Sequence, residues 1–329
     1  MEVIKNDGQL SIDNMDVAPV KIGGGQTLED KVAESKRTLL LASDMSHTYY
    51  DKPLIITYSG GKDSEVLLRI AEECLVTDFE VLNNHTTVDA PQTVRHIEKT
   101  FKRLNDKGIK TMYHNRYPVE NTMWDLIVKK CFPPTRTVRY CCAILKETGT
   151  PNRLAALGVR AAESVQRQGR EAFGVRGGQR RLVFFSVDHA EEVHRESQEI
   201  NDPAWDCTLI KSMKDHKDTT VNAIYEWEDE DVWDFIRDRQ IEVNPLYAMG
   251  FRRVGCVLCP LATKAEKQRE CEMFPQYRAN FEAAFDRMIH SKTYKNNGTK
   301  WTTGKEVFEW WMELDTQIEG QMDIFDFIN

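Results

Sequence analysis

The sequence contains no long apolar run and no excess of positive charge. No stretch approaches the roughly 18 apolar residues that a membrane-spanning helix needs. The first 25 residues lack a cationic stretch followed by an apolar one, which is the pattern of an export signal. Lys and Arg number 44 against 52 Asp and Glu, a net charge of −8, so the surface as a whole repels nucleic acids and anionic membranes. These absences predict a cytoplasmic protein with no membrane partner, in which any nucleic-acid contact needs a local basic patch.

Short apolar runs alternate with amphipathic runs from Pro53 onward. The spacing predicts strands over 53–59, 79–87, 109–114 and within 154–164, with helices between them over 62–74, 91–108 and 121–131. Strands interleaved with helices of this length are typical of an α/β protein with a doubly wound, mostly parallel sheet.

The chain is expected to divide into three consecutive parts. These are an N-terminal lead-in and helix (1–50), a nucleotide-binding α/β domain (51–235) and a helical C-terminal region (236–329). Thr27 with Asp30, and Thr303 with Glu306, have the spacing of helix capping boxes. Sequence from Ala262 to about Ile289 is expected to be helical.

The six residues "SGGKDS", Ser59–Ser64, lie between the first predicted strand and the following helix. Gly60 and Gly61 let backbone amides approach a ligand with no Cβ in the way. The helix adds unpaired N–H groups and the positive end of its dipole, and Lys62 adds a mobile positive charge, so a phosphate is the expected ligand. The spacing differs from G-x-x-x-x-G-K-[ST] and from G-x-G-x-x-G, which excludes the two commonest glycine-rich nucleotide loops.

Four of the eight cysteines form two close pairs, Cys141 with Cys142 and Cys256 with Cys259. Without an export signal, disulfides are not expected, and metal binding or buried thiols are the alternatives. Four thiolates suffice for a [4Fe–4S] cluster or a tetrahedral zinc ion. Vicinal cysteines chelate one small ion only with strain, which favours the cluster.

"SGGKDS" resembles the pyrophosphate loop (PP-loop) of the ATP pyrophosphatases, which have an adenine nucleotide alpha hydrolase-like fold. The resemblance implies that ATP and Mg²⁺ bind at Ser59, Gly60, Gly61, Lys62, Asp63 and Ser64, with Lys62 and Asp63 among the catalytic residues. In that superfamily the second strand ends near the nucleotide, which implies roles for Thr87 and Asp89. A simple helix-capping role for Asp89 before Pro91 is the alternative.

Together with the cysteine pairs, the loop makes the sequence similar to the phosphoadenosine phosphosulfate (PAPS) reductase family, from about Leu54 to Tyr277. "GVRAAES" with Arg167 is similar to the family's substrate segment, which implies that Arg160, Ser164 and Arg167 bind the nucleotide and that Arg160 is catalytic. "NAIYEWEDEDVWDFI" is similar to a further family signature, in which Trp227, Asp231 and Trp233 are interpreted as structural residues.

The sequence departs from the reductases at one point. They carry a C-terminal E-C-G-[LI]-H cysteine, the nucleophile that attacks sulfur, whereas the last cysteine here is Cys271. This pattern is similar to the DndC/SspD-like branch, the cluster-bearing ATP pyrophosphatases of DNA phosphorothioation. The resemblance implies an enzyme that activates an acceptor by adenylylation for sulfur transfer, with a cysteine desulfurase and DNA as partners, and a homo-oligomer. A PAPS or APS reductase and a non-catalytic nucleotide-sensing iron–sulfur protein remain alternatives.

Residues 165–185 contain four glycines and five arginines. The run is interpreted either as a solvated loop or as a segment whose arginines face an anionic substrate.

Overall fold

We analysed a computed structural model of the chain, which describes residues 26–163, 170–176, 182–199, 207–294 and 301–313. The chain forms two compact units, each built from several segments. Unit 1 contains 1–83, 92–112 and 150–254, and unit 2 contains 84–91, 113–149 and 255–329. The expected division into three consecutive parts stays a prediction. Within the described residues, no helix is both long and apolar enough to cross a membrane.

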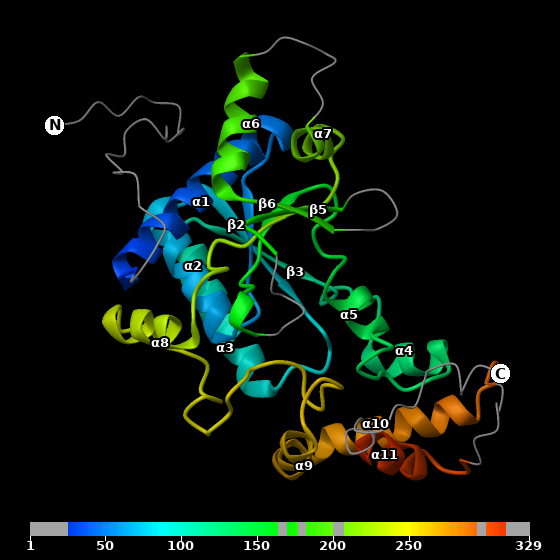
Figure 1. Cartoon of the computed structure of the whole chain (residues 1–329). Helices are drawn as coiled ribbons and strands as arrows, with labels where there is room; N and C mark the ends of the chain where they lie inside the picture. Colours follow the sequence, from blue (N-terminus) through cyan, green and yellow to red (C-terminus); the bar gives the residue numbers. More distant parts are fainter. Residues whose placement is uncertain (1–25, 164–169, 177–181, 200–206, 295–300, 314–329) are drawn as a thin grey trace. The chain divides into compact units, whose positions relative to one another are not determined.

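One seven-stranded sheet, drawn as arrows in Figure 1, organises the α/β part of the chain. Its spatial order is β3-β2-β1-β4-β7-β5-β6. The pairs β1–β2, β1–β4 and β4–β7 are parallel, whereas β5 is antiparallel to both β6 and β7. The predicted α/β class with a mostly parallel sheet is therefore confirmed. The strands are β1 (Leu54–Thr57), β2 (Phe79–Asn84), β3 (Lys110–His114), β4 (Leu154–Ala156), β5 (Phe173–Arg176), β6 (Leu182–Phe185) and β7 (Thr219–Val221).

The order of the strands creates a switch point between β1 and β4. From β1 the chain passes to β2 and β3 on one side, and it then returns to pair β4 on the other side of β1. In open parallel sheets, ligands bind outside the carboxyl ends of the strands at such a point. The segment after β1 is "YSGGKDS", so the topology puts the glycine-rich loop there.

Helices of unit 1 follow the predicted pattern closely. They are α1 (Leu28–Tyr50), α2 (Lys62–Cys74), α3 (Pro91–Asp106), α6 (Val187–Glu199), α7 (Thr208–Lys214) and α8 (Asp229–Asp238). The capping box of α1 is formed, because Thr27 accepts a hydrogen bond from the Asp30 amide and Asp30 accepts one from the Thr27 amide. Helix α1 packs against β1, β4 and β7, and α2 packs against β1 and α8.

The core of unit 1 follows from hydrophobic patterning. All three apolar residues of β1, Leu54–Ile56, are buried, as expected for a strand covered on both faces. In α2 the first turn is polar and the buried apolar residues begin at Val66. Full burial of each such side chain stabilises the fold by about 1.5–3 kcal/mol, which holds the start of α2 against the end of β1.

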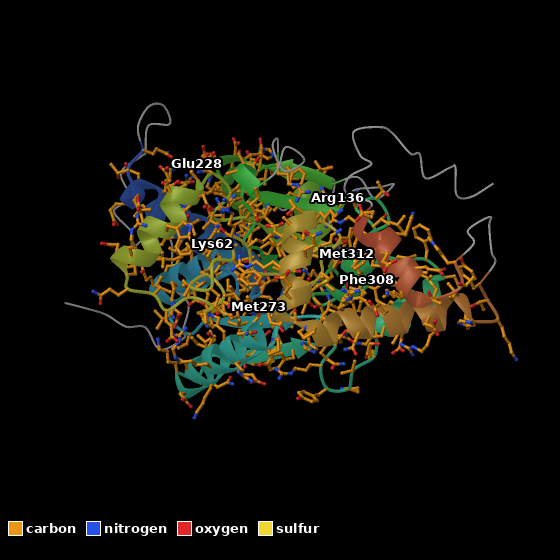
Figure 2. The ribbon with its side chains drawn as sticks, turned by 90° about the horizontal axis from the view of Figure 1, so that it is seen from below. Lys62, Arg136, Glu228, Met273, Phe308 and Met312 are labelled. Carbon is orange, nitrogen blue, oxygen red and sulfur yellow. The ribbon has the colours of Figure 1, made fainter. Side chains whose placement is uncertain are left out.

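Unit 2 is mainly helical. Its helices are α4 (Met123–Lys130), α5 (Tyr140–Leu145), α9 (Lys264–Met273), α10 (Pro275–Ile289) and α11 (Gly304–Glu313). Helix α10 packs against α4 and α11, and in Figure 1 α10 is the orange helix and α11 the red one. Aromatic rings fill this contact. The ring centroids of Phe281 and Trp311 lie 4.9 Å apart, and those of Phe285 and Phe308 lie 6.4 Å apart. Phe308 is labelled on α11 in Figure 2.

Three local expectations need correction. Residues 173–176 and 182–185 are strands rather than a solvated loop. The helical stretch after Ala262 is two helices, because Pro275 has no amide hydrogen with which to continue α9. The Thr303–Glu306 box is only half formed: the Thr303 hydroxyl accepts from the Glu306 amide, but the Glu306 carboxylate accepts from Thr302 instead.

Candidate functional site

The glycine-rich loop of unit 1 turns sharply between β1 and α2. Gly60 has φ +76°, and a Cβ on it would lie 3.0 Å from Cγ1 of Ile97, so the turn requires glycine. Gly61 is the N-cap of α2 and provides no side-chain hydrogen bond to the first turn. Ser64 stabilises the turn internally, because its hydroxyl accepts from the Ser59 amide and donates to the Gly61 carbonyl. The N-cap therefore supplies no side chain to the positive end of α2, which is suited to an anion.

The segment after β4 runs directly against this helix start. A Cβ on Gly158 would lie 3.0 Å from the Ser64 amide nitrogen and 3.1 Å from the Asp63 carbonyl carbon. A side chain here would require the neighbouring backbone to shift by a few tenths of an ångström, so glycine suits this close approach. Two residues later the chain reaches Arg160, and this approach explains why an arginine nearly 100 positions away in sequence reaches the glycine-rich loop.

Arg160 and Lys62 form a buried cluster with two carboxylates. The Arg160 side chain is 3% exposed and that of Lys62 is 6% exposed. Nε of Arg160 lies 2.6 Å from Oδ1 of Asp63, and Nζ of Lys62 lies 3.0 Å from the same oxygen. Oδ1 of Asp229 also accepts from both cations, at 2.6 Å from Nζ of Lys62 and 2.9 Å from Nη2 of Arg160. Two positive and two negative groups therefore balance each other.

Asp229 is the exposed member of this cluster. It is the first residue of α8, directly after Glu228, and Figure 2 labels Glu228 and Lys62 in the same region of unit 1. Its side chain is 63% exposed, unlike the two cations that it contacts. Desolvation raises the pKa of Asp229, but its contacts with Lys62 and Arg160 outweigh that effect and hold this pKa below its ordinary value.

A tyrosine hydroxyl occupies part of the helix start. The hydroxyl oxygen of Tyr247 accepts a hydrogen bond of 2.8 Å from the Lys62 amide. Burial raises the pKa of Tyr247 well above its ordinary value, so the hydroxyl is neutral. Sequence reasoning missed both Asp229 and Tyr247. Asp229 lies two residues after Trp227, in the segment interpreted as structural, whereas nothing in the sequence distinguishes Tyr247.

The structural interpretation of that segment agrees with the contacts. Trp227 is buried, and its Nε1 donates to the Ser35 hydroxyl at 3.0 Å. Asp231 accepts from the Glu228 amide, as the capping residue of α8, and it pairs with Lys31 of α1. These contacts fix the start of α8 and with it the position of Asp229.

Thr87 and Asp89 belong to unit 2. The Thr87 hydroxyl accepts from the Met123 amide at the start of α4, and Oδ2 of Asp89 accepts from the Thr86 amide. By accepting this hydrogen bond, Asp89 closes a turn within its own loop. Ser164 and Arg167 lie outside the described residues.

All four predicted cysteine ligands belong to unit 2. Cys141 and Cys142 are the second and third residues of α5. Cys256 and Cys259 flank a turn in which Leu258 has φ +56°. This turn is anchored twice, since the Val257 amide donates to the Val88 carbonyl at 2.8 Å and the Leu258 amide donates to Oε2 of Glu270 at 2.5 Å.

The four thiols share one electrostatic environment. A hydrogen bond from Cys141, assisted by one from Arg139, lowers the pKa of Cys142 to about 5. The same hydrogen bond, with burial and the charges of Cys142, Cys256 and Cys259, raises the pKa of Cys141. Burial raises the pKa of Cys256 to about 11, and the charge of Lys146 opposes that shift. Deprotonation of one thiol is therefore expected to change the pKa of its neighbours.

Four thiols in one unit match a [4Fe–4S] cluster in kind and number. The thiols make other contacts, however, and Sγ of Cys256 donates to the Thr86 hydroxyl at 3.4 Å. Among the residues that the structure describes, no three His, Cys, Asp or Glu side chains are gathered closely enough to hold a metal ion. The donor set thus fits such a group in its chemistry, and the side chains would have to rearrange to bind it.

The match to a family model defines the class of this protein. Residues 53–262 match the model of the phosphoadenosine phosphosulfate reductase domain, and the chain belongs to this family. This match confirms the resemblance at the level of the family, and the phosphorothioation branch stays a prediction.

Two curated relatives come from the archaeon Methanocaldococcus jannaschii. Uncharacterized protein MJ0066 is 25% identical over 236 residues, which are 68% of this chain and 40% of the relative. Uncharacterized protein MJ0973 is 24% identical over 220 residues, 67% of this chain and 44% of the relative. The chain therefore spans less than half the length of the curated relatives it matches.

Solved structures with related folds come from several enzyme classes. The phosphate complex of PAPS reductase from Candida auris has 11% identity and a TM-score of 0.38, over 70% of this chain and 96% of that one. A Candida glabrata FMN adenylyltransferase with FAD and pyrophosphate has 14% identity and a TM-score of 0.40, over 89% and 86%. The U34-tRNA thiolase of Methanococcus maripaludis with its [4Fe-4S] cluster has 12% identity and a TM-score of 0.40, over 84% and 87%.

Proposed function

We propose that this protein is an ATP pyrophosphatase that activates an acceptor by adenylylation for sulfur transfer. One observation carries the proposal: two buried cations, Lys62 and Arg160, meet at the glycine-capped start of α2, at the switch point of the sheet. A helix N-terminus with adjacent cations is suited to a polyphosphate, and the topology agrees with a nucleotide.

In this proposal the backbone amides of Ser59–Ser64 bind the β- and γ-phosphates of ATP. Lys62 and Arg160 stabilise the negative charge that develops on the departing pyrophosphate while an acceptor oxygen attacks the α-phosphorus. Because both side chains are already held in place by carboxylates, little reorganisation is needed when that charge appears. Asp63 keeps Arg160 in position throughout.

Mg²⁺ would be held by the carboxylate of Asp63. Carboxylate oxygens are the ligands that Mg²⁺ prefers, and this carboxylate lies in the first turn of α2 beside Lys62 and Arg160. When bound, the ion would supply further charge neutralisation for the phosphates.

We further propose that Cys141, Cys142, Cys256 and Cys259 hold a [4Fe–4S] cluster. The common electrostatic environment of the four thiols supports this assignment, and so do Lys146 and Arg139, which compensate negative charge there. When bound, the cluster would position a sulfur-transfer partner, relay sulfur, or join the segments of unit 2.

The acceptor we propose is DNA, modified to a phosphorothioate, with a cysteine desulfurase as the sulfur source and the protein acting as a homo-oligomer. Support comes from the sequence pattern, which keeps the loop and the cluster cysteines. Residues 113–149 carry six Lys or Arg against three Asp or Glu, and so supply a local basic segment for DNA in an otherwise acidic chain.

The family match favours a second candidate, a PAPS or APS reductase that forms sulfite. A reductase predicts sulfite from PAPS in the presence of thioredoxin. The adenylylating enzyme predicts pyrophosphate release from ATP without thioredoxin, and a nucleotide sensor predicts ATP binding without turnover. Parallel assays of these three activities on one preparation discriminate the candidates.

The decisive variant is Lys62→Ala, with Lys99→Ala as its control. Lys99 also pairs with a carboxylate of unit 1, Glu242, but is exposed and remote in sequence from the loop. We expect Lys62→Ala to reduce pyrophosphate release from Mg²⁺-ATP by about 100-fold, as removal of one preorganised donor typically does. Lys99→Ala should leave the rate unchanged. Equal rates for wild type and Lys62→Ala would refute the role of the lysine.

Anaerobic purification followed by iron and sulfide analysis tests the cluster separately. Cys256→Ser should lose most of the bound iron, whereas Cys271→Ser, another partly buried cysteine of unit 2, should retain it. Wild-type protein without iron or sulfide after anaerobic purification would contradict the assignment.

A further inference from the structure

We infer that the phosphate site is self-occupied: the Asp229 carboxylate and the Tyr247 hydroxyl hold, in the free protein, positions that the nucleotide's phosphate oxygens take in the complex. The inference rests on the proposed function, because it concerns the same loop. It adds that the protein carries its own competitor for the nucleotide.

The first observation is that one oxygen serves two buried cations. Oδ1 of Asp229 accepts from Lys62 at 2.6 Å and from Arg160 at 2.9 Å. A phosphate oxygen is expected to make this bridging contact, because it is a strong acceptor for lysine and arginine.

The second observation is that the Tyr247 oxygen accepts from the Lys62 amide at the start of α2. An anion bound at a helix N-terminus accepts hydrogen bonds from such amides.

The difference between Asp63 and Asp229 identifies which carboxylate can leave. Asp63 is 20% exposed and lies in the first turn of α2, so it stays beside Arg160. Asp229 is 63% exposed at the start of α8, so a rotation of its side chain would carry the carboxylate into water. Lys62 and Arg160 have no comparable access to solvent.

The charges give the expected sign of the effect. The four charged groups of the cluster sum to zero with Asp229 present and to one positive charge without it. If Asp229 competes with the ligand, then Asp229→Asn must bind phosphates more tightly than wild type. If Asp229 instead contributes contacts to the ligand, the same change must weaken binding.

The test is calorimetric titration of the full chain with inorganic pyrophosphate, without divalent metal. We expect Asp229→Asn to bind pyrophosphate about tenfold more tightly than wild type, because pyrophosphate no longer has to displace a charged hydrogen-bond acceptor from the site. Tyr247→Phe should bind about twofold to threefold more tightly, since a neutral acceptor competes less well. It serves as the second variant if Asp229→Asn folds poorly.

Two variants serve as controls. Glu230→Gln removes one negative charge from the next, exposed position of α8 and should bind like wild type. Asp229→Glu keeps a carboxylate at the site and should stay within about twofold of wild type, so that the gain of affinity follows the charge and not the substitution itself.

The outcomes separate this inference from the proposed function. Unchanged or weaker pyrophosphate binding by Asp229→Asn and Tyr247→Phe, while wild type binds Mg²⁺-ATP and Lys62→Ala does not, would overturn the self-occupied site and leave the nucleotide site intact. Failure of wild type and all variants to bind either pyrophosphate or Mg²⁺-ATP would overturn both. If Glu230→Gln raised the affinity for pyrophosphate as much as Asp229→Asn does, the gain would be explained by the loss of any nearby negative charge. That result would also overturn the inference.

Discussion

Arg160→Ala is expected to destabilise unit 1 strongly, because Arg160 makes three contacts from a buried position. Its guanidinium donates to Asp63 at 2.6 Å, to Asp229 at 2.9 Å and to the Trp227 carbonyl at 3.2 Å. Removing one partner of a buried ion pair costs about 3–5 kcal/mol. Water can replace the contact with the exposed Asp229, which is therefore worth at most about 1 kcal/mol. Lys62 still pairs with Asp63, so we expect a loss near the lower limit, about 3 kcal/mol.

Urea unfolding followed by tryptophan fluorescence measures this loss of stability. Arg239→Ala is the control, because Arg239 also contacts carboxylates, those of Glu73, Glu29 and Asp238, but is partly exposed. The control should lose no more than about 1 kcal/mol. The double variant Arg160→Ala/Asp63→Asn should recover about 1–2 kcal/mol, because it no longer buries the carboxylate that Arg160 compensated. A loss below about 1 kcal/mol for Arg160→Ala, or strict additivity in the double variant, would refute the reasoning.

Two further predictions concern stability away from the site. Burial raises the pKa of Glu72, but hydrogen bonds from Arg103 and Lys107 outweigh burial and lower this pKa below its ordinary value. The ionised Glu72 side chain therefore stabilises the fold above pH ~4.3, and this stabilisation is lost as the pH falls through the folded-state pKa. Glu72→Gln should cost about 2 kcal/mol at neutral pH and little in acid, and equal losses in urea titrations at both pH values would contradict this. In Gly304→Ala, a Cβ would lie 2.0 Å from the Glu282 carbonyl oxygen, so overpacking between α10 and α11 should destabilise unit 2 by about 3 kcal/mol. Gly255→Ala has open space and should melt like wild type, and identical melting of both variants would show that α11 shifts freely.

Most of the fold was predictable from local sequence patterns. Helix α2 begins and ends at the predicted residues, and the Thr27 capping box forms as expected, because both depend on neighbours in sequence. The pair β5–β6 was missed, since both strands are short, β5 contains a glycine and an arginine, and the pair joins the sheet only through the contact of β5 with β7. Tertiary pairing of this kind leaves no periodic signal in the sequence.

The candidate site was predictable in part. The loop residues and Arg160 were found from their motifs, and the structure brings Arg160 to Asp63 and Lys62. Asp229 was missed, because the same segment carries Trp227 and Asp231, whose packing roles explain the motif on their own. That a carboxylate bridges two buried cations follows only from the approach of Gly158 to α2, which is a long-range property of the fold.

The construction of unit 2 from three separate segments has a consequence for how the protein is made and dissected. During synthesis, Asn84–Pro91 and Tyr113–Gly149 leave the ribosome long before Gly255 is added. Cys141 and Cys142 are therefore synthesised before Cys256 and Cys259, and they have no contact with that second pair until the final segment emerges. Fragments that end before Gly255 lack two of the four proposed cluster ligands, so under the proposed function iron loading is expected only after translation has passed Cys259.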